Sequence, residues 1–525
     1  MQEGDHKLLR AAGSMSVMTM LSRVAGYFRD RLQAELLGAA ATYSGDAFVI
    51  AYRIPNLLRR LVAEGALTSA FVPTFTRYMK REDDAAMWRF AASVGSILTA
   101  ALGILVVGGV LLSPLIVIGL AWGYGDTPGK IELTVALNRV MWPYIFFISL
   151  SALAAAILNA FGSFALPAFT PVLLNLSIIG CGLLFRHSFR DPAFALATGV
   201  LVGGVLQLVI QVPALLRHGF RFEWPRPLDR DGVREVGRLM LPRLFGVGIT
   251  QINLVVDSQF ATSLRSGSAS FLYYANRVTE LTLGVFGISL STVILPTLSK
   301  AAVEGDREGV LRTLSTAMRL LLFVTIPATT GLVLLRMPII HVLFENGRFG
   351  PDDTRFTAEA LACYSLGLLP YAAVNVLATA FYAHRDTRTP VKVGLATFGL
   401  HLGLNFALRG PLQHSGIALS TAVSAFVDAA LLGFLLRRRY GEFLDAPVRA
   451  CLLRTVLAAG TMAGTLLLLR PYLDPFAHQG FPVKLAFLLA LISSGWTVYI
   501  LTALLTGSGE LKLVTSAFLR RRGGP

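Results

Sequence analysis

Apolar stretches about as long as a membrane-crossing helix recur along the whole chain, and short polar connections separate them. Runs such as Ser96 to Leu120 are apolar on every face of a helix, whereas the strands of a membrane β-barrel alternate in polarity. The pattern predicts an all-α polytopic membrane protein with about fourteen spans. We place these spans near residues 14–37, 46–75, 90–119, 133–160, 168–185, 193–216, 236–263, 269–297, 311–335, 356–383, 389–408, 416–436, 450–470 and 483–506.

Composition and charge support this interpretation. Hydrophobic residues make up 54% of the 525 residues and charged residues 15%, so the apolar surplus has to face lipid. The net charge of +16 would suit a nucleic-acid ligand, but Lys and Arg gather in alternate connections, such as residues 77–89 and 217–238. The positive-inside rule places these connections and both termini in the cytoplasm, and we expect no nucleic-acid partner. The first span lacks a small-residue cleavage site, which indicates a retained helix.

The chain also matches itself at an offset of 223 residues. Pro73 in FVPTF aligns with Pro296 in ILPTL, and ALAT from Ala195 aligns with ALST from Ala418. The offset covers about six spans, an even number, so both lobes enter the membrane from the same side. A cleft between two such lobes would hold a substrate and open alternately to each side. Two six-helix lobes and a final pair of spans are therefore expected, at residues 1–225, 226–441 and 442–525.

Ionisable residues inside the spans indicate a polar site, because each costs about 2.5–3.5 kcal/mol near the centre of a bilayer. They follow helical faces in three spans. The residues are Arg23, Arg29 and Asp30 in the first span, Asp46, Arg53, Arg59, Arg60 and Glu64 in the second, and Arg277 and Glu280 in the eighth. Arginine outnumbers the nearby carboxylates, which favours a phosphate or pyrophosphate ligand. The alternative is that these residues pair with one another, as Arg277 with Glu280, and only fasten helices together.

Other polar residues in the spans have open interpretations. Asp257 in the seventh span is a candidate cation or proton site, or a hydrogen bond between packed helices. Asp428, His401 and Asn405 are equally ambiguous.

Two further features lie near the ends of spans. Arg31 and Glu35 lie close to a helix end and are expected to extend toward the membrane surface. The connection at about 337–356 contains HVLFENGRFGPDD, which predicts a short re-entrant or amphipathic element.

The sequence contains no motif of an enzyme. It has no GxxxxGK[ST] phosphate loop and no HExxH, GxSxG or CxxC spacing, so we expect a transporter driven by an ion gradient, the membrane potential or a partner. Cys181, Cys363 and Cys451 are scattered through apolar spans and are predicted to be small hydrophobic residues. No cofactor is expected.

Three long segments of the chain resemble the MviN/MurJ family of lipid II flippases, in the multidrug/oligosaccharidyl-lipid/polysaccharide exporter superfamily. They are SVMTMLSRVAGYFRD at 16–30, GDAFVIAYRIPNLLRRLVAEGALTSAFVP at 45–73 and YYANRVTELTLGVFGISLSTVILPTLSK at 273–300. The resemblance extends over essentially the whole chain. It implies movement of lipid II, the undecaprenyl-pyrophosphate-linked peptidoglycan precursor, from the cytoplasmic to the periplasmic leaflet of the bacterial inner membrane. Its implied partners are lipid II, membrane lipids and the cell-wall synthesis machinery.

The resemblance also implies roles for particular residues. By motif position, a central cavity that grips the pyrophosphate and forms the gate contains Arg23, Arg29, Asp30, Asp46, Arg59, Glu64, Arg277 and Glu280. The two C-terminal spans would form a groove for the prenyl tail. Asp257, Asn405 and Thr421 match positions that bind sodium in some relatives, although Asn405 stands where those relatives have a carboxylate. The coupling ion is therefore sodium or a proton, or the membrane potential drives transport.

Three other functions are consistent with parts of the pattern. A transporter of the same fold would carry another polyprenyl-linked oligosaccharide, or would exchange drugs for cations. Cationic drugs favour buried carboxylates, which the excess of arginine argues against. A membrane-embedded glycosyltransferase, or an assembly factor that transports nothing, is the third alternative, and the sequence has no cluster of catalytic acids at a membrane surface.

Overall fold

The computed structural model describes residues 3–60, 67–81, 83–220, 227–473, 479–511 and 513. Within these residues every regular element is a helix, apart from one isolated antiparallel bridge between Asn346 and Phe349. The chain forms two compact units. The first contains residues 1–270 together with the short segment 346–350, and the second contains residues 271–345 and 351–525.

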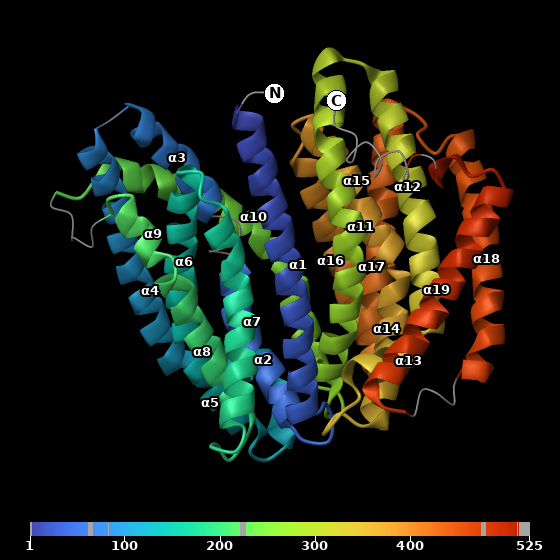
Figure 1. Cartoon of the computed structure of the whole chain (residues 1–525), viewed down its shortest axis with the longest axis horizontal. Coiled ribbons are helices and arrows are strands. Elements are labelled where there is room, and N and C mark those ends of the chain that lie inside the picture. Colours follow the sequence, from blue (N-terminus) through green and yellow to red (C-terminus); the bar gives the residue numbers. More distant parts are fainter. Residues whose placement is uncertain are drawn as a thin grey trace. The chain divides into compact units, whose positions relative to one another are not determined.

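The first unit is a bundle of helices from the N-terminal half of the chain (Figure 1). Its elements are α1 (Glu3–Leu37), α2 (Ser44–Leu58), α3 (Leu67–Arg81), α4 (Asp84–Leu120), the 3₁₀ turn η2 (Trp122–Asp126), α5 (Lys130–Met141), α6 (Pro143–Ala160), α7 (Ala165–Phe185), α8 (Ala193–Val209), α9 (Val212–Arg217) and α10 (Arg230–Thr262). Helix α7 packs between α1 and α8, and α2 packs against α5. One core cluster joins α1, α2, α5, α7 and α8, and a second lies among α3, α4 and α6.

The second unit contains the remaining helices (Figure 1). They are α11 (Ser268–Glu304), α12 (Arg307–Leu334), α13 (Arg336–Phe344), α14 (Pro351–Leu366), α15 (Leu368–Ala383), α16 (Arg388–Leu408), α17 (Gln413–Tyr440), α18 (Ala446–Leu473) and α19 (Phe481–Leu505). Helix α17 packs against α14, α15 and α16, while α18 lies between α12 and α19. The main core cluster is formed by α11, α12, α15 and α17.

Aspartate side chains begin three of the long helices. Asp83, Asp229 and Asp306 each accept a hydrogen bond from the backbone N–H three residues later, at the start of α4, α10 and α12. These contacts satisfy one of the amide groups that the first turn of a helix leaves without an intrahelical partner. Each of these three polar connections therefore ends in an aspartate that caps the N-terminus of the following helix.

Within the described residues the predicted spans fall mainly on helices, and the chain is a polytopic all-α membrane protein. Ten helical segments of the described residues are long and apolar enough to cross a membrane. Several predicted spans are each built from two consecutive helices, such as α5 with α6 and α14 with α15. The total of fourteen spans stays a prediction, as do the domain boundaries at 225 and 441. Cys181, Cys363 and Cys451 are free thiols.

Candidate functional site

Asp46 lies in the first turn of α2 and is 1% exposed. Its carboxylate accepts hydrogen bonds from Lys130 Nζ at 2.8 Å and from the Gly267 backbone N–H at 2.8 Å. Ser270 donates two more, from its backbone N–H at 3.0 Å and from its hydroxyl at 2.9 Å. Gly267 and Ser270 stand at the start of α11, so the carboxylate lies at the positive end of that helix dipole. These donors compensate the loss of hydration that burial of a charge requires.

Lys130 completes this cluster from the first residue of α5. Its ammonium lies 4.0 Å from the centre of the Tyr124 ring, and 3.4 Å from the Ser266 hydroxyl. Only 3% of the Lys130 side chain is exposed. Lys130 has no recognisable signal in the sequence, because it lies in a connection without a motif and its partner Asp46 is 84 positions away.

Arg29 and Asp30 lie near the C-terminal end of α1, as the sequence predicts, and they form an ion pair. Arg29 donates to Asp30 Oδ1 from Nη2 at 2.7 Å and from Nε at 3.1 Å. Its third nitrogen, Nη1, donates to Asn175 Oδ1 of α7 at 2.9 Å. Asn175 in turn donates to the backbone carbonyl of Ser22 at 3.1 Å. The guanidinium is therefore fixed by α1 and α7 together, a geometry that only a planar fork of donors allows.

Arg53 of α2 and Arg59, the residue after the end of α2, contact neutral oxygen atoms. Arg53 Nη1 donates to the Leu254 carbonyl of α10 at 3.1 Å, and Arg53 lines a pocket of about 290 Å³ between α2, α4 and α10. Arg59 donates from Nε and Nη2 to the Asn56 side-chain oxygen at 3.1 and 3.0 Å. These contacts orient both guanidinium groups.

Arg277 and Glu280 of α11 contact each other, with Arg277 Nη1 3.1 Å from Glu280 Oε2. The guanidinium also lies over the Tyr273 ring, 5.0 Å from its centre. The pairing considered as an alternative is thus present, but both residues belong to one helix, so this contact does not fasten two helices. Arg23 of α1 is exposed, and Glu64 lies outside the described residues.

The charged residues of α1 and α2 belong to the first unit, and Arg277 and Glu280 belong to the second. The single cavity that would join these two sets stays a prediction.

The candidate sodium ligands are likewise divided between the units. Asp257 lies on α10 of the first unit, and Asn405 and Thr421 lie on α16 and α17 of the second. Asn405 is fully buried, with its Nδ2 3.2 Å from His401 Nε2. The Thr421 hydroxyl donates to the Ile417 carbonyl of its own helix at 3.0 Å. Sodium binding stays a prediction.

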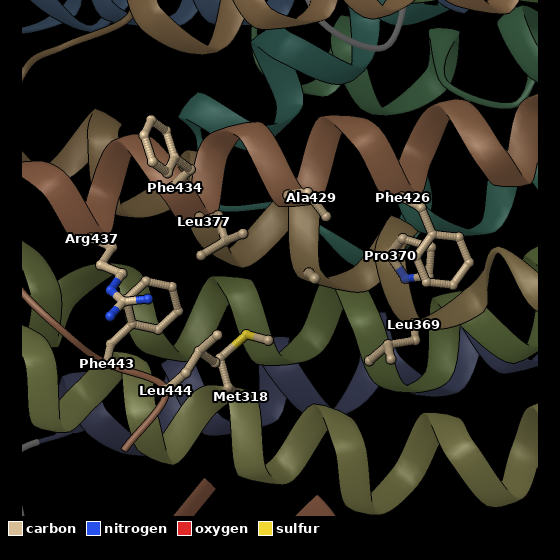
Figure 2. Close-up of a pocket in the computed structure, with 13 residues that line it drawn as sticks. Met318, Leu369, Pro370, Leu377, Phe426, Ala429, Phe434, Arg437, Phe443 and Leu444 are labelled. Carbon is tan, nitrogen blue, oxygen red and sulfur yellow. The ribbon is translucent and has the colours of Figure 1, made fainter. Parts of the chain in front are cut away.

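A pocket of about 380 Å³ lies within the second unit, where the side chains of α12, α15 and α17 and of the turn before α18 meet (Figure 2). Its walls are formed by residues such as Met318, Leu377 and Phe434, and Arg437 stands at one end. Such a lining suits hydrocarbon and offers a pyrophosphate only one cationic group. It is therefore distinct in character from the arginine-bearing faces of α1 and α2.

Comparison with known proteins identifies the family. A family model described as lipid II flippase MurJ matches residues 33–490. A probable lipid II flippase MurJ of Vibrio cholerae is 37% identical over 512 residues, which cover 95% of this chain and 96% of that protein. The lipid II flippase MurJ of Burkholderia cenocepacia is 36% identical over 444 residues, covering 84% and 86% of the two chains.

Solved structures agree with these relatives. A lipid II flippase MurJ in an inward closed conformation matches with a TM-score of 0.77 and 28% identity, covering 93% of this chain and 97% of that one. An inward-facing multidrug resistance transporter of the MATE family and MOP superfamily matches with a TM-score of 0.68 at 15% identity, covering 83% and 99%, which shows a shared fold alone. By sequence along nearly its whole length and by fold, the chain belongs to the MurJ family of lipid II flippases.

Proposed function

We propose that this chain moves lipid II from the cytoplasmic to the periplasmic leaflet of a bacterial inner membrane. The observation that carries the proposal is the 37% identity to a probable lipid II flippase, which extends over 95% of this chain and 96% of that protein. The chain is a transporter and not an enzyme. Its product is the same molecule in the opposite leaflet.

The physical task is to move a charged, sugar-bearing head group through hydrocarbon. Burying polar groups without partners costs several kcal/mol each, roughly 2–7 for an amide or a hydroxyl. Arginine fixed in advance by neighbouring side chains is suited to replace the water around a pyrophosphate, because its donors match phosphate oxygens in pairs. Arg29, held by Asp30 and Asn175, and the exposed Arg23 on the same helix support this role. The prenyl tail stays in hydrocarbon throughout.

Direction and energy source are part of the proposal. The arginine-rich connections support a cytoplasmic position of both termini by the positive-inside rule. The sequence has no ATP-binding phosphate loop, so transport draws on sodium, protons or the membrane potential. Lobes that rock about a central cavity would expose it to each side in turn. The cell-wall synthesis machinery that supplies and consumes lipid II is the expected set of partners.

The test replaces the native flippase of a bacterium with this chain. After depletion of the native protein, lipid II accumulates on the cytoplasmic face, where a reagent that cannot cross the membrane does not label it. We expect the wild-type chain to restore labelling from the periplasm. Arg23→Ala, Arg29→Ala, Arg59→Ala and Arg277→Ala should each restore less at equal abundance. Full rescue by all four variants would contradict the proposed binding site. Failure of the wild-type chain to move lipid II would favour another lipid-linked oligosaccharide as the substrate.

A further inference from the structure

Residues 346–350 are a strap that leaves the second unit and belongs to the first. The strap connects α13 with α14, and a backbone hydrogen bond of 3.0 Å from Phe349 to Asn346 closes it into a tight turn. Gly347, the first central residue of this turn, has a φ of +56°, as a type II′ turn requires. Phe349 is 1% exposed, so its side chain anchors the turn.

The strap holds the C-terminal end of α1. The backbone N–H of Arg348 donates to the Glu35 carbonyl at 2.9 Å, and Asn346 Nδ2 donates to Glu35 Oε2 at 3.0 Å. The Glu35 carbonyl is one of the last four of its helix, which have no intrahelical donor. Glu35 accepts both hydrogen bonds, and its extension toward the membrane surface stays a prediction.

Two glycines are required for this approach. Gly38, which ends α1 with a φ of +65°, lies so close to the strap that an added Cβ would stand 2.6 Å from the Arg348 carbonyl oxygen. A Cβ at Gly347 would stand 2.7 Å from the Glu35 carbonyl oxygen. Both positions therefore combine a backbone conformation that favours glycine with a backbone contact that cannot yield easily.

The turn held by the strap leads directly into the Asp46 cluster. A Cβ at Gly45 would stand 2.4 Å from the Gly38 carbonyl oxygen and 3.3 Å from the Ser270 hydroxyl. The residue after Gly45 is Asp46, which caps the start of α11. The segment between α1 and α2 is thus packed against the strap at Gly38 and against the start of α11 at Gly45.

We propose that residues 346–350 act as a clasp on the C-terminal end of α1, which positions the Asp46-bearing turn when closed and must open during each transport cycle. The inference rests on the proposed function, since the cycle it refers to is lipid II transport. Because α1 bears Arg23, Arg29 and Asp30, a movement of the C-terminal end of α1 away from residues 346–350 has to break both hydrogen bonds to Glu35.

The first test links Glu35→Cys to Asn346→Cys with a short bis-methanethiosulfonate, which joins each thiol through a disulfide bond that a reductant can break. The background replaces Cys181, Cys363 and Cys451 by serine, and each single cysteine variant serves as a control. We expect the double variant to crosslink, to lose lipid II transport when crosslinked and to regain it after reduction. Absence of a crosslink, or full transport by the crosslinked protein, would overturn the proposal.

The second test changes the strap itself in the same double-cysteine background. Gly347→Ala should lower the ratio of closed to open clasp about 5- to 30-fold, as expected of a cost of one or two kcal/mol, and the crosslinking rate should fall with it. Gly350→Ala is the matched control, because a Cβ there has no heavy atom within 4 Å. Equal crosslinking rates in these two variants would contradict the clasp.

Crosslinking is measured without lipid II. A failure of the flippase proposal can therefore be distinguished from a failure of the clasp proposal. If the wild-type chain moves no lipid II while the crosslink forms and responds to Gly347→Ala, the flippase proposal fails and the closed clasp stands. If lipid II moves normally in the crosslinked protein, the flippase proposal stands and the clasp fails.

Discussion

The ammonium of Lys130 lies 2.8 Å from a carboxylate oxygen of Asp46, and only 3% and 2% of these side chains are exposed. Loss of Lys130 would leave the Asp46 carboxylate buried with its neutral donors from Gly267 and Ser270 but without a cation. The pair therefore ties the start of α5 to the start of α2, and through Asp46 to the first residues of α11.

Lys130→Met should destabilise the protein by about 3–5 kcal/mol, because Asp46 would remain buried without its cation. Thermal denaturation in detergent, followed by loss of the monodisperse protein, measures the effect. Lys300→Met is the control, since the Lys300 side chain is 78% exposed and lies 3.9 Å from Glu304, a surface contact of little energy. Equal melting temperatures for the two variants would show that the buried pair does not contribute as described.

Gly109→Ala should lower the melting temperature, because an added Cβ would stand 2.4 Å from the ring of Trp142. That ring is fixed by a 2.8 Å hydrogen bond from its Nε1 to Asn138 Oδ1, which also accepts from Ser113 at 3.0 Å. Overpacking of this kind costs about 1–3 kcal/mol. The neighbouring Gly108→Ala meets nothing within 4 Å and should be neutral or slightly stabilising. An unchanged melting temperature in Gly109→Ala would mean that α4 can move away from Trp142 without loss of stability.

Arg29→Lys should reduce lipid II transport about tenfold or more, because one charged hydrogen bond contributes about 1.5–3 kcal/mol and lysine cannot reach Asp30 and Asn175 at once. The rate is measured in the depleted strain at matched abundance. Arg31→Lys, two positions further along α1, is the control, since the Arg31 guanidinium donates to the Tyr27 hydroxyl at 3.4 Å and we assign it no role in transport. Identical rates for the two variants would argue against a fixed fork at position 29.

Asp386, in the connection between α15 and α16, predicts a dependence of stability on pH. The backbone N–H and the hydroxyl of Thr389 and the guanidinium of Arg439 hold the pKa of Asp386 below its ordinary value of 3.8. A carboxylate with a lowered pKa stabilises the folded state above its ordinary pKa, and the stabilisation is lost as the pH falls through the lowered value. Asp386→Asn should therefore melt earlier than the wild type at neutral pH, and the difference should vanish in strong acid. A difference that persists there would contradict the assignment.

The helices and their charged faces were predictable from the sequence, because a span of apolar residues has to be about 20 residues long and buried charges stand out within it. The ion pair of Arg277 with Glu280 was also among the stated alternatives, since the spacing puts both on one helical face. The pairing of Asp46 with Lys130 and the strap at 346–350 were not predicted as contacts. Both contacts join segments that are far apart in the sequence. The local sequence does not indicate which distant backbone segment a glycine will pack against.

The central claim is tested most directly in liposomes that contain the purified chain. The measurement follows the movement of purified lipid II between their two leaflets. The fraction of lipid II open to a water-soluble reagent outside the vesicles is followed over time, beside empty liposomes. The account predicts that the wild-type chain makes lipid II from the inner leaflet accessible, and that the Arg29→Ala variant does so more slowly. Equal rates with and without the wild-type chain, under an imposed ion gradient or membrane potential, would contradict it.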